Sequence, residues 1–345
     1  MAKNPYTLVF GKKPSQIISR TGQSMDIVET FDDDDPSQQI YMITGVRGSG
    51  KTVFMTEVAT TLERNDDWIV VELNPEKDLL EQLASILCSQ DRLARIFQKA
   101  KINLSFFGIG LVVDGVAPIT NIEVAITRIL ESLKKDKKKL LITIDEVTNS
   151  KSMREFAAAF QIFVRKDLPI YLLMTGLYNN ISRLENEKSL TFLHRAPKIH
   201  IKPLGINIIP DNYMKVLGVD KETAHNMASM TKGYSFAFQV LGYYAWAHEN
   251  DLDAAIPEYK QYLYDYVYDK IWSEISAEDK RVLSAIADSE DGRIIGIRNK
   301  LGMETNQFNP YRDRLKKYGI INGDTHGYVT LVLPLFDEYI SDKEE

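Results

Sequence analysis

The sequence predicts an α/β protein: a parallel β-sheet covered by helices on both faces, then an all-α region, then a C-terminal module of three helices and a β-hairpin. Five short apolar runs alternate with helical segments, which is typical of buried parallel strands. From Pro203 onward the strand-like runs stop and helical periodicity takes over. The predicted strands lie near residues 40–44, 68–73, 140–144, 169–174 and 198–201.

The composition is that of an ordinary globular protein. The chain has 345 residues, of which 44% are hydrophobic and 26% charged, and a net charge of −6. This length favours two or three domains, and the negative charge argues against a polycation that coats nucleic acid. We find neither a signal-peptide layout nor an uncharged apolar run of about 18 residues, so we expect no membrane span and a cytoplasmic location.

A glycine-rich stretch between the first predicted strand and a helix matches the pattern G-x-x-x-x-G-K-[ST]. Glycines can take positive φ and leave room for backbone N–H groups to curl around a phosphate, and the helix N-terminus favours an anion. Lys51 can reach the terminal phosphates, and the Thr52 hydroxyl can bind Mg²⁺. We therefore predict a nucleoside triphosphate site. Its residues are Gly45, Val46, Arg47, Gly48, Ser49, Gly50, Lys51, Thr52 and Val53.

A carboxylate pair, Asp145 and Glu146, ends the apolar run 140–144. The carboxyl ends of the strands of a doubly wound sheet form the crevice in which ligands bind. We expect Asp145 to hold Mg²⁺, and Glu146 to orient and activate the attacking water. Alone the pair is a weak signal, but its position after a phosphate loop makes it a strong one.

Two further residues are catalytic candidates. Thr175 ends the run 169–174 and could hydrogen-bond the attacking water or the γ-phosphate; the alternative is that it caps the next turn. Arg195 precedes the last predicted strand and could reach a phosphate on its own or a neighbouring chain. The alternative for Arg195 is a surface ion pair.

The end of the chain predicts a winged helix-turn-helix. Helices are expected over 277–287, 294–301 and 310–317, the last with Asn309 as N-cap and Pro310 at its first position. A strand–turn–strand follows over 319–332, with Asn-Gly as the turn signal. Separately, residues 102–120 are rich in Gly and β-formers and predict a β-hairpin between helices.

The third helix of this module carries basic residues, so DNA binding has to be weighed against a packing role. Residues 261–345 hold 11 basic and 16 acidic residues, a net charge of 11 − 16 = −5. Phosphate contact demands a basic face, so we favour packing over DNA binding. The basic residues of the helix are Arg312, Arg314, Lys316 and Lys317.

These signals divide the chain into four predicted parts. Residues 1–37 form an N-terminal arm and a short helix, and residues 38–205 the sheet domain with the phosphate loop. Residues 206–260 form a helical region. Residues 261–345 form a linker helix and the winged-helix domain.

These residues together resemble an AAA+-type P-loop ATPase of the STAND clade, in the bacterial subset of the archaeal-ATPase-like group, and distantly the origin-recognition initiator ATPases. The resemblance implies an αβα core, a helical lid and a winged helix. It also implies that the N-terminal arm and the lid near Gly233 enclose adenine, that Thr175 is the sensor-1 residue and that Arg195 contacts phosphate. The segments that carry it are Gly45–Thr52, Ile142–Glu146, Met174–Gly176, His194–Ala196, Ile199–Leu204 and the arm from Asn4 to Arg20.

The sequence departs from this family's pattern at two places. Ser19 stands where a Gly is usual, and residues 231–238 lack the lid arginine that initiator ATPases carry. We predict a slow, Mg-dependent ATPase that releases ADP and acts as a molecular switch. Its nucleotide state would control the lid and winged helix and thereby partner binding, and a homo-oligomer and a protein partner both stay open. The alternatives are a DNA-binding ATPase of the initiator or mobile-element kind, and a module that keeps ATP as a structural ligand. The intact Glu146 argues against the structural-ligand alternative.

Overall fold

The computed structural model describes residues 3–9, 14–90, 93, 102–108 and 117–344. Contacts group the chain into two compact units, which we describe one at a time. The sheet unit consists of Arg20–Thr44 and Lys51–His200. The helical unit consists of Met1–Ser19, Gly45–Gly50 and Ile201–Glu345.

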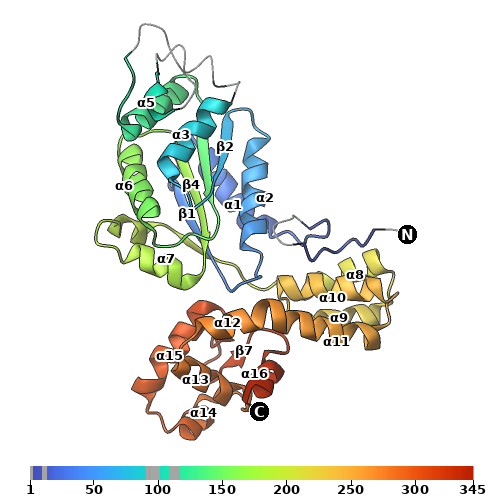
Figure 1. The fold of residues 1–345 in the computed structure, drawn as a ribbon. Helices are drawn as coiled ribbons and strands as arrows, with labels where there is room; N and C mark the ends of the chain where they lie inside the picture. The colour runs from blue at the N-terminus through green and yellow to red at the C-terminus, as the bar shows by residue number, and fades with distance from the viewer. Residues whose placement is uncertain (1–2, 10–13, 91–92, 94–101, 109–116, 345) are drawn as a thin grey trace. The chain divides into compact units, whose positions relative to one another are not determined.

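The sheet unit is built on five parallel strands in the spatial order β2-β3-β4-β1-β5 (Figure 1). All five strands predicted from the apolar runs are confirmed, with ends shifted by at most two residues. The strands are β1 (Ile40–Thr44), β2 (Trp68–Leu73), β3 (Lys139–Ile144), β4 (Ile170–Gly176) and β5 (Lys198–His200).

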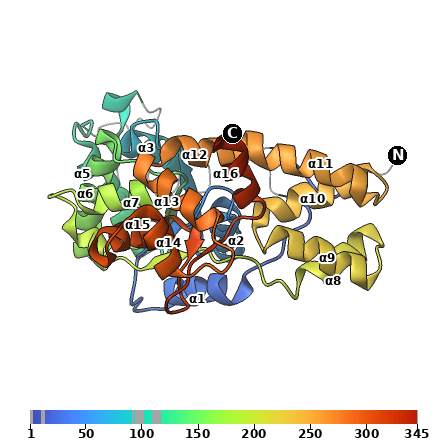
Figure 2. The ribbon, with the colours of Figure 1, turned by 90° about the horizontal axis from the view of Figure 1, so that it is seen from below.

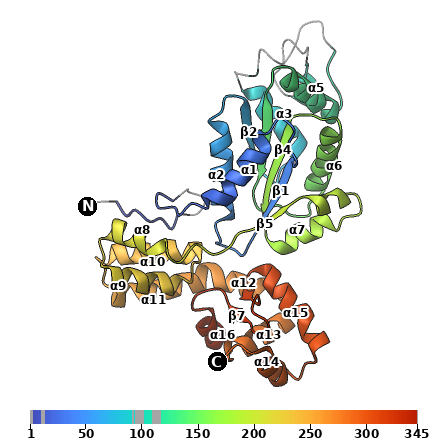
Figure 3. The same ribbon diagram turned by 180° about the vertical axis from the view of Figure 1, so that it is seen from behind.

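Helices cover both faces of this sheet, as Figures 1 and 3 show from opposite sides. One face carries α1 (Thr21–Asp32) and α2 (Lys51–Glu63), and the other carries α3 (Leu79–Ser89), α5 (Ile122–Lys135) and α6 (Lys151–Arg165). Parallel strands covered on both faces read as continuous apolar runs, and β4 is buried over its whole length.

An aromatic cluster fixes α1 against its face of the sheet. Phe31 packs on Trp68 and on Tyr171, with ring centroids 6.4 and 5.0 Å apart. The indole N–H of Trp68 donates to Asp32 at 2.8 Å, so the end of α1 is held by a polar contact as well. Such aromatic pairs contribute beyond their buried area.

After β4 the chain forms α7 (Tyr178–Glu185) and the 3₁₀-helix η2 (Thr191–Arg195). One prediction about the sheet unit needs correction. The expected hairpin over 102–120 is wrong where the chain is described, because residues Ser105–Phe107 form the 3₁₀-helix η1. Residues 109–116 of that prediction lie outside the described residues.

The helical unit begins with four helices packed side by side, α8 (Ile209–Leu217), α9 (Lys221–Thr231), α10 (Ser235–Ala247) and α11 (Leu252–Leu263) (Figure 2). The α11 helix runs on through the π-helical turn η3 (Tyr264–Tyr268) into α12 (Asp269–Glu274). Residues 252–274 thus form one continuous helical segment with a π-helical turn inside it.

The N-terminal arm packs into this helical group through Tyr6. The Tyr6 side chain is 1% exposed, and its hydroxyl donates to Asn212 Oδ1 at 2.9 Å. Its ring lies against Gly242 of α10, where an added Cβ would come within 2.7 Å of three ring carbons. The close packing of the Tyr6 ring therefore requires glycine at position 242, inside the helix.

The C-terminal elements are three helices, a two-stranded antiparallel ladder and a last helix. The ladder lies in the predicted strand–turn–strand region, but Asn322 pairs with Thr330, so Asn-Gly does not form a two-residue turn. The last helix was not predicted. These elements are α13 (Ala277–Ala287), α14 (Ile294–Leu301), α15 (Thr305–Tyr318), β6 (Ile321–Asn322), β7 (Thr330–Leu331) and α16 (Phe336–Glu344).

The expected start of α15 is wrong. The helix begins five residues before Pro310, with Glu304 and Gln307 forming a capping box that satisfies backbone N–H groups at both positions. Pro310 therefore lies inside α15, where Asn309 is not its N-cap. None of the helices in the described ranges combines the length and the apolarity that crossing a lipid bilayer requires.

We expect Gly242→Ala to lower the thermal midpoint of unfolding by several degrees. Alanine in a helix interior is normally better than glycine by about 1 kcal/mol, but here the new methyl group would overlap the Tyr6 ring, and overpacking costs about 1–3 kcal/mol. Differential scanning calorimetry of the full chain measures the shift.

The matched control is Gly296→Ala in α14, because a Cβ at Gly296 meets nothing within 4 Å. This variant should unfold at the same temperature as the wild type or higher. If Gly242→Ala also raised the midpoint, the packing of Tyr6 on α10 would be contradicted.

Candidate functional site: a phosphate loop and an Asp–Glu pair

The predicted phosphate loop is a tight turn between β1 and α2. Gly48 and Gly50 take the left-handed conformation, with φ of 73° and 93°. The N–H of Ser49 donates to the carbonyl oxygen of Val46 at 3.2 Å. Only glycine adopts such φ values without a steric penalty, so these two glycines allow the chain to reverse just before Lys51 begins α2.

Gly45 serves the loop in another way. Its φ is not in the left-handed region, but a Cβ there would come within 2.6 Å of Ser49 Oγ and 3.4 Å of Ile201 Cβ. The missing side chain therefore lets the two ends of the loop approach each other. Lys51, 8% exposed, starts the helix that the loop leads into.

The sheet unit brings the predicted metal ligands together. Thr52 lies in the first turn of α2, and Asp145 follows the last residue of β3. The Thr52 hydroxyl donates to Asp145 Oδ2 at 2.7 Å. The two oxygen atoms, 93 residues apart in the sequence, thus lie side by side.

Thr175 organises the carboxylate pair from the neighbouring strand. Its hydroxyl, which is fully buried, donates to Asp145 Oδ1 and accepts a bond from the Glu146 N–H at 3.1 Å. The parallel register that pairs Ile144 with Met174 places Asp145 and Thr175 next to each other. Here the hydroxyl bridges two residues of the pair, whereas the sequence suggested either a ligand contact or a turn cap.

Glu146 has an unusual backbone. Its φ is +53°, which is uncommon for a residue that carries a Cβ. The backbone N–H donates to Asp145 Oδ1 at 3.2 Å as well as to Thr175, and these bonds hold the conformation. The residue is exposed, so its carboxylate is open to solvent.

Arg195 ends η2, two residues before Pro197, and is exposed. Within the described ranges no carboxylate lies within ion-pair distance of its guanidinium. The surface ion pair that was the alternative reading is therefore not formed among these residues.

At the end of β1, Thr44 Oγ1 lies 2.7 Å from His200 Nδ1 on β5. Burial lowers the pKa of His200 below its usual value, and the nearby Lys198 charge lowers it further. Both effects favour the neutral form of the imidazole.

Sequence reasoning missed two residues that touch the loop from within the helical unit. The hydroxyl of Tyr234 donates to the carbonyl oxygen of Arg47, and that of Ser235 to the carbonyl oxygen of Ser49. Their only sequence signal is their place after Gly233. Arg47 itself forms an ion pair with Glu274 at 3.1 Å.

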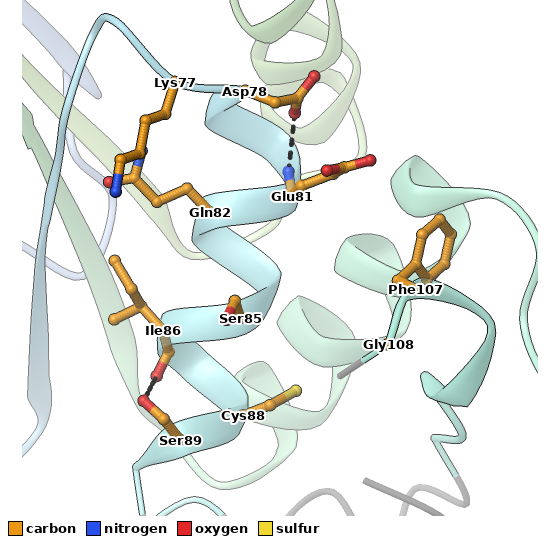
Figure 4. A pocket seen from close by; sticks show the side chains of 10 residues that line it. All are labelled: Lys77, Asp78, Glu81, Gln82, Ser85, Ile86, Cys88, Ser89, Phe107 and Gly108. Carbon is orange, nitrogen blue, oxygen red and sulfur yellow. Dashed lines mark hydrogen bonds between the residues drawn. The ribbon is translucent and has the colours of Figure 1, made fainter. Parts of the chain in front are cut away.

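A separate hollow of about 840 Å³ lies on the sheet unit between α3 and η1 (Figure 4). It is lined by residues such as Gln82, Cys88 and Phe107 and contains none of the predicted site residues. Among the described residues, no group of three or more His, Cys, Asp or Glu side chains could hold a metal ion.

Two family descriptions match parts of the chain. Residues 27–191 match an ATPase domain predominantly from Archaea, and residues 265–340 match a domain of unknown function (DUF8462). No curated protein matches the chain. The match over residues 27–191 confirms the resemblance to archaeal-ATPase-like P-loop ATPases.

Solved structures agree on the fold. The Walker-type ATPase paby2304 of Pyrococcus abyssi superposes with a TM-score of 0.66 at 16% identity, over 94% of this chain and 96% of that one. The ORC2 protein of Aeropyrum pernix, solved in ADPNP–ADP complexes, gives a TM-score of 0.61 at 14% identity, over 97% of both chains. The chain thus has the α/β core of a P-loop ATPase, followed by a helical region.

We expect Thr175→Val to lower the free energy of unfolding by about 1–3 kcal/mol. The change removes two hydrogen bonds of the Thr175 hydroxyl, the one it donates to Asp145 and the one it accepts from the Glu146 N–H. Thr175→Ser keeps the hydroxyl and should lose only about the 0.8 kcal/mol of one buried methyl group. Thermal unfolding of both variants measures the difference. A valine variant as stable as the wild type would contradict the bridging role of the hydroxyl.

Proposed function

We propose that this protein is a Mg-dependent ATPase that acts as a molecular switch. The observation that carries the proposal is the hydrogen-bonded set Thr52–Asp145–Thr175–Glu146, in which Thr52 follows the phosphate-loop turn in the sequence. In this proposal the loop residues Gly45 to Val53 bind ATP, and ADP is the product. The nucleotide state then controls the lid and the winged helix, and through them a partner.

The residues divide the chemistry among them. Glu146 accepts a proton from the attacking water as the water oxygen bonds to the γ-phosphorus. The bond from that phosphorus to the bridging oxygen breaks, and ADP and phosphate leave. Lys51 stabilises the negative charge on the terminal phosphates. Thr175, whose hydroxyl is already engaged by Asp145 and Glu146, is a positioning residue in this scheme.

The oxygen atoms of Thr52 and Asp145 suit a magnesium ion. Mg²⁺ prefers oxygen ligands and keeps several waters, so it takes only one or two groups from a protein and the rest from phosphate. A hydroxyl and a carboxylate oxygen 2.7 Å apart at the first turn of α2 fit this requirement. When bound there, Mg²⁺ neutralises charge that develops on the phosphates.

We propose that the C-terminal elements α13, α14, α15 and the β6–β7 ladder form a winged helix with a packing or protein-binding role. The domain boundaries 1–37, 38–205, 206–260 and 261–345 remain part of this proposal. DNA binding is disfavoured by charge, because three of the four basic side chains of α15 form ion pairs with carboxylates. These ion pairs are Arg312–Asp313, Arg314–Asp279 and Lys316–Asp324.

Arg195 is proposed as a phosphate ligand. Its exposure, the lack of a carboxylate partner among the described residues and the short connection to Pro197 all suit an arginine that meets a phosphate. The phosphate could belong to its own chain or to a neighbouring copy. A neighbouring copy would make hydrolysis depend on a homo-oligomer.

We expect Glu146→Gln to bind Mg·ATP like the wild type but to hydrolyse it about 10²–10⁴ times more slowly, because general-base catalysis contributes this much. Phosphate release under saturating ATP measures the rate, and isothermal titration calorimetry the affinity. Equal hydrolysis rates in the wild type and the variant would exclude Glu146 as the base.

Lys51→Ala is the companion variant, since it removes the charge that attracts the β- and γ-phosphates. It should give no binding heat with ATP while unfolding at nearly the wild-type temperature. ATP binding of wild-type strength in this variant would remove the phosphate-loop interpretation.

For Arg195→Ala we expect nearly normal ATP binding with turnover reduced on the order of 10³-fold, as for arginines that stabilise transferring phosphates. The matched control is Arg183→Ala, which removes an exposed arginine from α7 of the same unit and should keep full turnover. Specific activity that rises with protein concentration indicates action on a neighbouring copy. Unchanged turnover in Arg195→Ala would rule out the role.

A further inference from the structure

Two side chains of the helical unit bind the outward-facing carbonyl groups of the phosphate loop. The Tyr234 hydroxyl donates to the Arg47 carbonyl oxygen at 2.5 Å, and the Ser235 hydroxyl donates to the Ser49 carbonyl oxygen at 2.9 Å. Tyr234 is the residue before α10 and Ser235 is its first residue. The loop residues Gly45–Gly50 and these two side chains belong to the same compact unit.

Peptide planarity turns these two bonds into constraints on two N–H groups. In a planar trans peptide the C=O of one residue and the N–H of the next point in opposite directions. A hydroxyl that holds the Arg47 carbonyl therefore directs the Gly48 N–H away from Tyr234. In the same way, the bond to Ser49 directs the Gly50 N–H away from Ser235.

These N–H groups are the donors that a phosphate loop offers to its anion. Gly48 and Gly50 have φ values that leave their peptide planes free to turn, because glycine occupies both signs of φ with similar ease. Carbonyl bonds from outside the loop remove that freedom. The two hydroxyl groups thus preorganise the loop before an anion arrives.

Tyr234 is well suited to this task. Its side chain is 4% exposed, and burial raises its pKa far above the usual value, so the hydroxyl keeps its proton and remains a donor. Its own turn is fixed by Gly233, where φ is +74° and an added Cβ would come within 2.5 Å of the Leu204 carbonyl oxygen. The Leu204 N–H donates to the Gly233 carbonyl at 2.7 Å.

Gly48 shows how closely this turn approaches the loop. A Cβ at Gly48 would overlap the Tyr234 hydroxyl and come within 2.9 Å of Phe236 Cβ. The phosphate-loop pattern permits any residue at this position. Both the positive φ of Gly48 and the approach of Tyr234 require glycine there, so the contact accounts for a residue that the pattern alone does not explain.

We propose that Tyr234 and Ser235 are positioning residues for nucleotide binding, which hold the carbonyl groups of Arg47 and Ser49 so that the Gly48 and Gly50 N–H groups face the phosphates. The group that these N–H groups would bind is the β-phosphate, which nucleoside di- and triphosphates share. The inference rests on the proposed function, because it assumes that the loop binds ATP. By linkage, a bound phosphate also stabilises the start of α10.

The test uses Tyr234→Phe, Ser235→Ala and the double variant in the full chain. Each single variant loses one hydrogen bond to the loop, so its affinities for ATP and ADP should fall by about two- to tenfold. The double variant should lose more. The effect is expected in KM, with kcat within about twofold of the wild type, because neither hydroxyl touches the reacting atoms. Calorimetric titration and steady-state phosphate release give these values.

Two control variants separate positioning from general stability. Tyr259→Phe removes a bond of the same kind, from a fully buried tyrosine of the same unit to the Met230 carbonyl at 3.0 Å, and should leave ATP affinity unchanged. Ser235→Thr keeps a hydroxyl and should bind ATP more tightly than Ser235→Ala.

Amide hydrogen exchange without nucleotide gives a second readout. Tyr234→Phe should speed exchange in the peptide covering residues 45–52, and Tyr259→Phe should not. The inference is overturned if Tyr234→Phe and Ser235→Ala match the wild type in both affinity and exchange, or if Tyr259→Phe weakens ATP binding equally. Failure of the proposed function looks different: the wild type itself, like Lys51→Ala, would give no ATP heat, and the exchange experiment would still test the contact.

Discussion

The bridge from Thr175 to Asp145 and Glu146 is the contact on which the candidate site depends. Two adjacent parallel strands, β3 and β4, end at the same edge of the sheet, and their register sets the Thr175 hydroxyl against the turn that follows Ile144. One buried hydroxyl then fixes a carboxylate by donating to it and a backbone N–H by accepting from it. The turn after Ile144 needs the register of β3 and β4 to make these bonds. The geometry of the candidate site therefore depends on the packing of the apolar core beneath it.

Much of the sheet unit could be predicted from the sequence because its signals are local. A fully covered parallel strand is a continuous apolar run, and the glycines before Lys51 mark a turn that few other residues can make. The positions of Asp145 and Glu146 followed from the same logic, since strand ends of a doubly wound sheet meet at one edge. The juxtaposition of Thr52 and Asp145 agrees with it.

The contacts that could not be predicted are those between distant segments, for which no period or spacing exists. Tyr234 and Ser235 approach a loop almost 190 residues away, and only the folded chain shows that their hydroxyl groups meet its carbonyl groups. Local signals also competed with one another. Pro310 reads as a helix start, but the capping box of Glu304 and Gln307 begins α15 earlier. Pro310 therefore lies inside α15, where it has no backbone N–H to donate.

Glu146 has a left-handed backbone conformation, which a residue with a Cβ adopts only at a cost in energy. Glycine would adopt this φ freely, and asparagine would do so more easily than glutamate, but neither carries a carboxylate. With Glu146 as the proposed base, glycine or asparagine at position 146 would suit the backbone better, whereas the reaction would need the carboxylate. Under that proposal, replacements that relax the backbone would stabilise the protein and lower its activity, so selection for thermostability would favour less active variants at this position.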